Sequence, residues 1–65
     1  MRLKVGSNIQ RLRIKNYLTQ EQLAELIDVS RQTVYKWEAD ISLPKIDKLE
    51  ILMKVLNSSL EELLF

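Results

Sequence analysis

The segment over residues 30–36, SRQTVYK, gathers side chains that could recognise a partner through hydrogen bonds. It offers a guanidinium, a carboxamide, hydroxyl groups and an ammonium, and it contains no acid. Val34 and Trp37 lie three residues apart, so a helix here would turn them to one side and the polar residues to the other. Guanidinium and carboxamide groups can form paired hydrogen bonds with the edge of a nucleic-acid base. The sequence therefore indicates a polar surface that could read base edges, made of Ser30, Arg31, Gln32, Thr33, Tyr35 and Lys36.

Such a helix must be held by its neighbours, and the residues just before it predict a second helix and a tight turn. Thr19 and Gln22 have the spacing of a capping box, which marks the start of a helix. Its apolar pattern ends at Ile27, Asp28-Val29 interrupts it, and Ser30 is a suitable N-cap for the helix that follows. We therefore expect two helices and a turn over residues 19–38.

The other segments also have helical spacing. Apolar residues recur at intervals of four and three over residues 5–12, which is the period of one helix face. Pro44 fits the first position of a fourth helix. Ser59, with Glu62 three residues on, can open a fifth with a second capping box. No segment alternates long enough to predict a strand. We predict an all-α fold, a compact five-helix bundle forming one domain over residues 1–65, with a core of Ile9, Leu12, Leu23, Ala24, Ile27, Val29, Val34, Trp37, Leu49, Leu52, Met53, Leu56, Leu60 and Leu63.

The residue types that are missing exclude several classes of function. The 65 residues include no Cys and no His, which excludes zinc fingers and catalysis by thiolate or imidazole. A single Gly excludes the glycine-rich loops that bind phosphate. The carboxylates and hydroxyls have no recognisable base, metal or oxyanion partner, so we expect no enzyme, no metal, no cofactor and no small-molecule ligand. No apolar run approaches the roughly 18 residues of a membrane helix. Residues 1–4 lead into a charged segment rather than a signal peptide, so we expect a cytoplasmic protein.

Charge is distributed unevenly along the chain, although the formal net charge is only +1. Residues 1–37 carry seven Lys and Arg against three Asp and Glu, whereas residues 38–65 carry three against six. This asymmetry is consistent with a basic working face and a neutral or acidic remainder. The alternative is a solvated surface whose charges happen to be uneven.

These fragments, in this order and spacing, resemble the Cro/phage-repressor (XRE) class of helix-turn-helix DNA-binding domains. The resemblance runs from Ile9 to Leu64 and implies the lambda-repressor-like fold. It rests on Arg13, Thr19-Gln20, Leu23-Ala24-Glu25, Val29-Ser30-Arg31, Thr33-Val34, Trp37-Glu38, Pro44 and the closing Ser59-Leu60-Glu61-Glu62-Leu63-Leu64.

The resemblance also implies roles for particular residues. The helix from Ser30 to about Ala39 would lie in the major groove of double-stranded DNA. Arg31 and Gln32 match the main base-reading positions of the family, and Lys36 matches a third. Contacts to the DNA backbone, to a thymine methyl or to bases at the margin would come from Ser30, Thr33 and Tyr35. Phosphate contacts would come from Thr19, Gln20 and Lys45.

Two further features concern the scaffold. Arg13 and Glu38 match positions that pair beneath the reading helix in this family, the alternative being two unrelated surface charges. Asp28 and Asp40 stand where the family usually or often has Gly. Both positions are expected to need a left-handed backbone, which Asp tolerates better than most residues.

The leading hypothesis is a transcriptional regulator, of repressor type, that binds an inverted-repeat operator as a homodimer. Two-fold symmetry would double the few base pairs that one helix can read. The alternative is a protein-interaction module, such as an antitoxin or an adaptor, that uses the same fold. The apolar residues off the core stripes are Ile14, Leu26, Ile41, Leu43, Ile51, Val55 and Phe65. Those near the loop between the third and fourth helices and near the C-terminus could supply a dimer surface, by analogy with the family.

Overall fold

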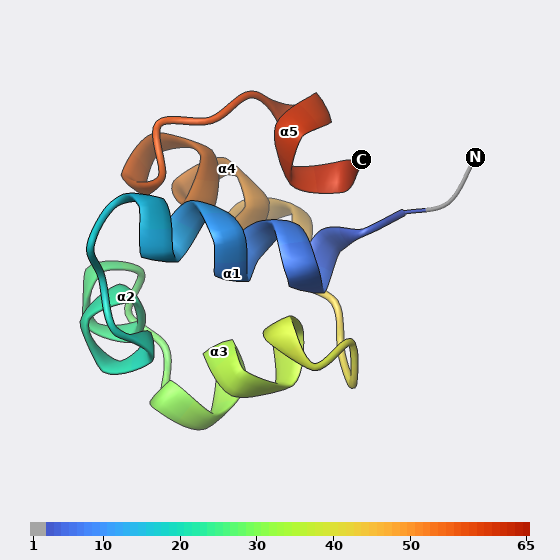
Figure 1. The fold of residues 1–65 in the computed structure, drawn as a ribbon. Helices are drawn as coiled ribbons and strands as arrows, with labels where there is room; N and C mark the ends of the chain where they lie inside the picture. The colour runs from blue at the N-terminus through green and yellow to red at the C-terminus, as the bar shows by residue number, and fades with distance from the viewer. Residues whose placement is uncertain (1–2) are drawn as a thin grey trace.

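The computed structural model describes residues 3–65, and over these residues the chain forms five helices and no strand (Figure 1). Met1 and Arg2, which the predicted domain and the charge count include, lie outside the described residues. The all-α prediction is confirmed, with helices α1 Val5–Lys15, α2 Gln20–Leu26, α3 Arg31–Glu38, α4 Ile46–Val55 and α5 Leu60–Leu64. None of the helices within residues 3–65 is long and apolar enough to cross a membrane.

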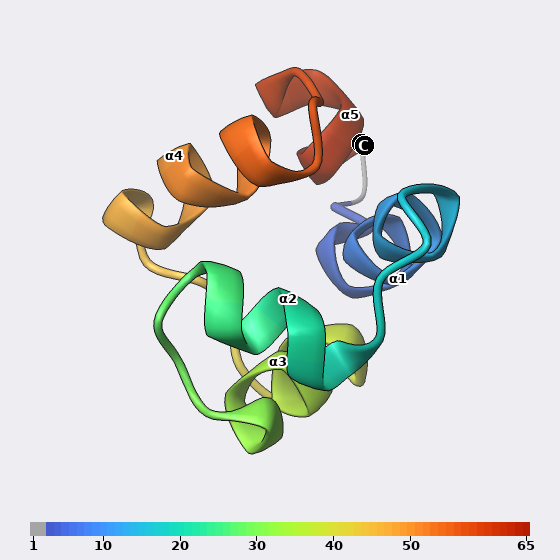
Figure 2. The same ribbon diagram turned by 90° about the vertical axis from the view of Figure 1, so that its left-hand side faces the viewer.

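The helices enclose one core, to which each of them contributes. Figure 1 shows α1 crossing the middle of the molecule, with α3 on one side and α4 and α5 on the other. Turned by 90°, the molecule shows α2 against α3 at the same end (Figure 2). One side chain from every helix is completely buried, namely Ile9, Leu23, Val34, Leu52 and Leu63. Since no single helix here is long enough to be stable alone in water, this shared burial holds the fold together.

Local side-chain bonds set where three helices begin. The amide of Gln22 donates to Thr19 Oγ1 at 3.0 Å, and the amide of Thr19 donates back to Gln22 Oε1 at 2.9 Å. Ser59 and Glu62 form the same reciprocal pair at the start of α5, so both predicted capping boxes are confirmed. Ser30 caps α3 as predicted, since its Oγ accepts from the Thr33 amide at 3.1 Å.

The start of α4 differs from the prediction. The helix begins at Ile46, and its N-cap is Lys45, which is still extended (φ −73°, ψ 166°). Pro44 therefore precedes the cap and is not the first helical residue. Pro44 is buried and continues the extended chain that leads from α3 to α4.

Four helices end in the same way, each with a non-glycine residue in the left-handed region. These residues are Tyr17 (φ 59°), Asp28 (φ 58°), Asp40 (φ 58°) and Asn57 (φ 52°). After each of them, the next amide reaches back to a carbonyl five residues earlier, as in Val29 N to Ala24 O at 3.0 Å, which is the Schellman arrangement. The expected left-handed backbone at Asp28 and Asp40 is confirmed.

The predicted core is largely confirmed, with one clear error. Leu60 is 44% exposed. Asn8 in α1 donates to Leu63 O, and the amide of Lys4, just before α1, donates to Leu64 O. The C-terminal end of α5 therefore packs inward, whereas Leu60 lies at the other end. Val29, Leu49 and Met53 are only partly buried, as are Ile51 and Val55, which the sequence had placed off the core. Val5 is 3% exposed and joins the core although the prediction omitted it.

Candidate nucleic-acid interface

The polar side of α3 is the surface that the sequence singled out, and the fold presents it outward. Val34 is 0% exposed and Trp37 is 4% exposed, so these two side chains attach α3 to the body of the protein. Arg31, Gln32, Tyr35 and Lys36 are all exposed on the remaining surface of the helix. Arg31, Gln32 and Tyr35 line one open hollow of about 360 Å³. Hydrogen-bond donors and acceptors thus gather on the exposed side of α3.

Ser30 and Thr33 are placed differently from the other four residues on this side. The Ser30 hydroxyl caps the helix, and it lies 2.9 Å from the Thr33 hydroxyl. Thr33 is also half-buried. Both hydroxyls therefore contribute to the first turn of α3, which limits how far they can extend toward a partner.

A bidentate ion pair beneath α3 connects it to α1. Arg13 Nε donates to Glu38 Oε2 at 2.6 Å, and Arg13 Nη2 donates to Glu38 Oε1 at 3.1 Å. The two side chains are only 11% and 4% exposed, respectively. The third guanidinium nitrogen, Nη1, donates to the carbonyl of Leu18 at 2.7 Å, just before α2. Gln20, the first residue of α2, donates from Nε2 to Glu38 Oε1 at 3.1 Å. A single carboxylate thus accepts from α1 and α2 and fixes both to the last residue of α3.

The expected phosphate-contacting residues lie at the starts of two different helices. Thr19 and Gln20 lie together at the start of α2. The Thr19 hydroxyl accepts a hydrogen bond in its capping box, and the side-chain carboxamide of Gln20 donates to Glu38. Lys45 lies apart from them at the start of α4, where it is exposed and makes no capping bond. The structure therefore places Thr19 and Gln20 beside each other, with Lys45 beyond the connection that follows α3.

A second contact between α1 and α3 was missed by the sequence analysis. The amide of Gly6 donates to Asp40 Oδ1 at 3.1 Å, which supplies the capping acceptor that Lys4 does not provide for α1. A Cβ on Gly6 would lie 2.6 Å from Trp37 O and 2.8 Å from Glu38 O, so only glycine permits this approach. The one glycine of the chain, placed early in an apolar helical pattern, was the available signal.

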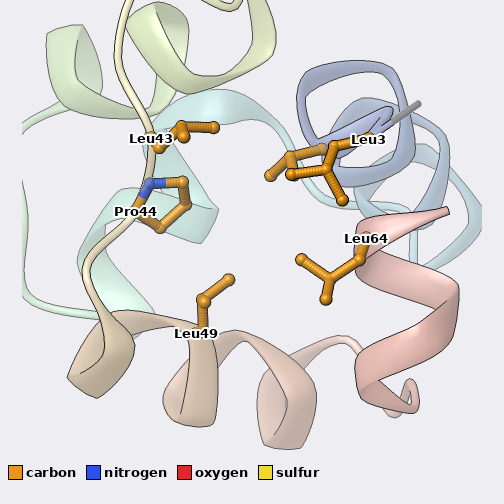
Figure 3. Close-up of a pocket in the computed structure, with 6 residues that line it drawn as sticks. Leu3, Leu43, Pro44, Leu49 and Leu64 are labelled. Atoms are coloured by element: carbon orange, nitrogen blue, oxygen red, sulfur yellow. The ribbon is translucent and has the colours of Figure 1, made fainter. Parts of the chain in front are cut away.

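An apolar hollow of about 200 Å³ lies between the α3–α4 connection, α4 and the two ends of the described chain. Its lining consists of Leu3, Val5, Leu43, Pro44, Leu49 and Leu64. Figure 3 shows the labelled side chains directed toward one another across it. Leu3 and Leu43 are 55% and 62% exposed, so the hollow opens onto an apolar surface.

Comparison with known proteins defines the class to which this protein belongs. A helix-turn-helix family model matches residues 9–63. The transcriptional activator BcrR of Enterococcus faecalis is 37% identical over 62 residues, which is 95% of this chain but 30% of that protein. Two uncharacterised helix-turn-helix regulators, one from Rickettsia conorii and one from Rickettsia prowazekii, are each 32% identical over 57 residues. The match covers 88% of this chain in both cases, 46% of the Rickettsia conorii protein and 44% of the Rickettsia prowazekii protein. The chain therefore spans less than half the length of these relatives.

Solved structures agree with this assignment. A transcriptional regulator from Listeria innocua superposes with a TM-score of 0.90 at 30% identity, covering 98% of this chain and 60% of that one. The P22 c2 repressor, solved with a synthetic operator, has a TM-score of 0.87 at 30% identity, with 92% and 91% coverage. The biofilm master regulator SinR, solved with DNA, has a TM-score of 0.83 at 27% identity, with 91% and 95% coverage. The fold and the exposed side of α3 define a helix-turn-helix domain. The chain belongs to the helix-turn-helix family of Cro and phage-repressor type, a family of DNA-binding transcription regulators.

Proposed function

We propose that this chain is the sequence-reading domain of a transcription regulator, and that α3 lies in the major groove of double-stranded DNA. The observation that carries the proposal is the division of α3 into two sides. Its apolar side is buried through Val34 and Trp37, while its exposed side carries Arg31, Gln32 and Lys36 and no acid. A major groove about 12 Å wide admits one helix, and these side-chain types match the polar edges of the bases.

Within this proposal the residues divide into two groups. Arg31, Gln32 and Lys36 read bases, with Tyr35 at the margin of the same surface and Ser30 and Thr33 closest to the start of the helix. Phosphates on either side of the groove are contacted from the start of α2, by Thr19 and Gln20, and from the start of α4, by Lys45. Phosphate contacts of this kind fix orientation and do not themselves carry sequence information.

We further propose that two copies bind an inverted repeat. The apolar hollow that opens at Leu3 and Leu43 supports this, because a second copy docked there would cover exposed apolar surface close to the α3–α4 connection. Repression is the outcome we favour, since occupying an operator is enough to exclude other proteins, whereas activation needs an additional contact surface. We place the protein in the cytoplasm, where its operator would be, and expect residues 1–65 to fold as one unit.

A selection from random duplex DNA tests the proposal. We expect an enriched inverted repeat, and we expect Arg31→Ala to weaken binding to it by about 1–3 kcal/mol while relaxing preference at one or two positions. Lys54→Ala is the matched control, because it removes one exposed positive charge from α4. If no sequence is enriched, or if Arg31→Ala and Lys54→Ala behave alike, the chain does not read DNA sequence through α3. Binding to an acidic protein instead would favour the interaction-module alternative.

A further inference from the structure

One of the four left-handed helix ends is occupied by a residue poorly suited to it. Asp28, Asp40 and Asn57 have short polar side chains that tolerate a positive φ, but Tyr17 is a bulky aromatic residue at φ 59°. Glycine would adopt the same backbone without steric cost. A strained non-glycine residue at a position that glycine could occupy suggests that its side chain has a function.

The Tyr17 side chain has no packing role within the described residues. It is 93% exposed, the largest value among the exposed large apolar and aromatic residues of the described chain. Its backbone amide completes the end of α1 by donating to Ile14 O at 2.9 Å, which any residue in this conformation would do. The ring and its hydroxyl therefore project into solvent and add little to the core.

The backbone on both sides of Tyr17 is nevertheless held in place by hydrogen bonds. On one side of it, Asn16 Nδ2 donates to Leu56 O at 3.2 Å, which ties the connection to the end of α4. On the other side, the carbonyl of Leu18 accepts from Arg13 at 2.7 Å. A side chain mounted on a backbone held from both sides is pre-organised for a contact, since little further order is lost on binding.

The second of these bonds places Leu18, the residue after Tyr17, close to the point where α1, α2 and α3 meet. Arg13, which holds Leu18, is paired with Glu38 at the end of α3, and Gln20 at the start of α2 is bonded to that same carboxylate. Figures 1 and 2 show the α1–α2 connection running from α1 toward the end of the molecule that α2 and α3 form. If α3 occupies a groove, the α2 end of this connection adjoins Thr19 and Gln20, the proposed phosphate contacts.

We propose that Tyr17 is a further DNA contact, in which its phenolic hydroxyl donates a hydrogen bond to a backbone phosphate oxygen beside the groove that α3 occupies. Tyrosine is among the side chains that make such contacts. The inference deepens the proposed function and rests on it. A phosphate is favoured over an acidic protein because Tyr17 lies in the part of the chain that is rich in Lys and Arg and two residues before Thr19 and Gln20, the proposed phosphate contacts.

The proposal predicts opposite effects on stability and on binding. Tyr17→Gly relieves the strained backbone, so we expect its melting temperature to rise by about 3–6 °C. The same change removes the hydroxyl, so we expect it to weaken binding to a fluorescent duplex of random sequence by about tenfold in low salt. A residue with a merely structural role would shift both quantities in the same direction.

Two further variants separate the hydroxyl from the backbone. Tyr17→Phe keeps the ring and the strain, and we expect most of the loss in affinity with no change in melting temperature. Asn57→Gly relieves the equivalent backbone at the end of α4, and we expect it to raise the melting temperature while leaving affinity unchanged. Because Tyr17→Phe removes no Lys or Arg, the salt dependence of binding should keep its slope in this variant, whereas Lys45→Ala should reduce the slope by about one unit.

The outcomes distinguish this proposal from the one it rests on. If Tyr17→Gly and Tyr17→Phe bind the random duplex as tightly as the unmodified chain, while Arg31→Ala still weakens binding to a selected sequence, the Tyr17 contact is wrong and the proposed function stands. If the unmodified chain binds no duplex, the proposed function fails and the contact fails with it. If Tyr17→Gly loses affinity only for an acidic protein partner, Tyr17 belongs to a protein interface and the phosphate contact is overturned.

Discussion

Removing the Glu38 carboxylate should destabilise the fold by about 2–4 kcal/mol. Glu38→Ala deletes the acceptor of three hydrogen bonds, two from Arg13 and one from Gln20. Among residues 3–65, the guanidinium, which is 11% exposed, then keeps the carbonyl of Leu18 as its one acceptor. A buried charge that loses its partner costs about 3–5 kcal/mol, and the residual exposure of Arg13 and its bond to Leu18 lower our expectation.

Equilibrium urea unfolding would measure this loss. The core of a domain this small rarely supplies more than about 3–5 kcal/mol, so Glu38→Ala should be close to unfolded in buffer at 25 °C. Glu38→Gln, which keeps an acceptor oxygen, should lose less and give a complete transition. Glu50→Ala removes an exposed carboxylate from α4 and serves as the matched control, with an expected change within about 0.5 kcal/mol.

A double replacement tests whether the unpaired guanidinium of Arg13 causes the loss of stability in Glu38→Ala. Arg13→Met with Glu38→Leu removes both charges together, so we expect it to recover most of the stability that Glu38→Ala loses. If Glu38→Ala unfolds at the same urea concentration as Glu50→Ala, the ion pair does not hold the helices together. If the double variant is no more stable than Glu38→Ala, the loss does not come from an unpaired guanidinium.

The remaining predictions concern single positions. Gly6→Ala should destabilise by about 1–3 kcal/mol in a thermal melt, since its Cβ would lie 2.6 Å from Trp37 O, and a gain from higher helix propensity would contradict this. Asp28→Gly should stabilise by about 0.5–1 kcal/mol by relieving φ 58°, and an unchanged melting temperature would refute the strain argument. The hydrogen bond from the Ser59 amide lowers the pKa of Glu62 below its ordinary value. The ionised Glu62 carboxylate therefore stabilises the fold at any pH above the ordinary pKa, and this stabilisation is lost as the pH falls through the lowered pKa. Melts from pH 7 to pH 2 should show this loss, and Glu62→Gln should lack this component of the pH dependence.

Features that depend on a few consecutive residues could be predicted from the sequence. Ser and Thr caps act over three residues, so Thr19, Ser30 and Ser59 could be assigned before any fold was known. The spacing of Val34 and Trp37 likewise predicted which side of α3 would be buried and which would face outward. The contacts of that outward side with DNA stay predictions.

Features that depend on where one helix lies relative to another could not be predicted in this way. Asp40 accepts from Gly6 across 34 positions of sequence, and Asn8 donates to Leu63 across 55. Leu60 has a suitable spacing for burial but lies at the end of α5 that packs least, and it remains 44% exposed. The left-handed Tyr17 was also unexpected, because its residue type gives no signal for that conformation.

The sequence by itself determined the number and class of the elements, the helix caps, the exposed side of α3 and the family, because these follow from the spacing of residues along a helix and from motifs of a few residues. Only the tertiary structure decided how those elements meet. It placed Glu38 where α1 and α2 both donate to it, brought Gly6 into contact with the end of α3, and left an apolar hollow open beside Leu43. Such contacts depend on the packing of a whole core, in which every side chain constrains the others, and no local pattern specifies them.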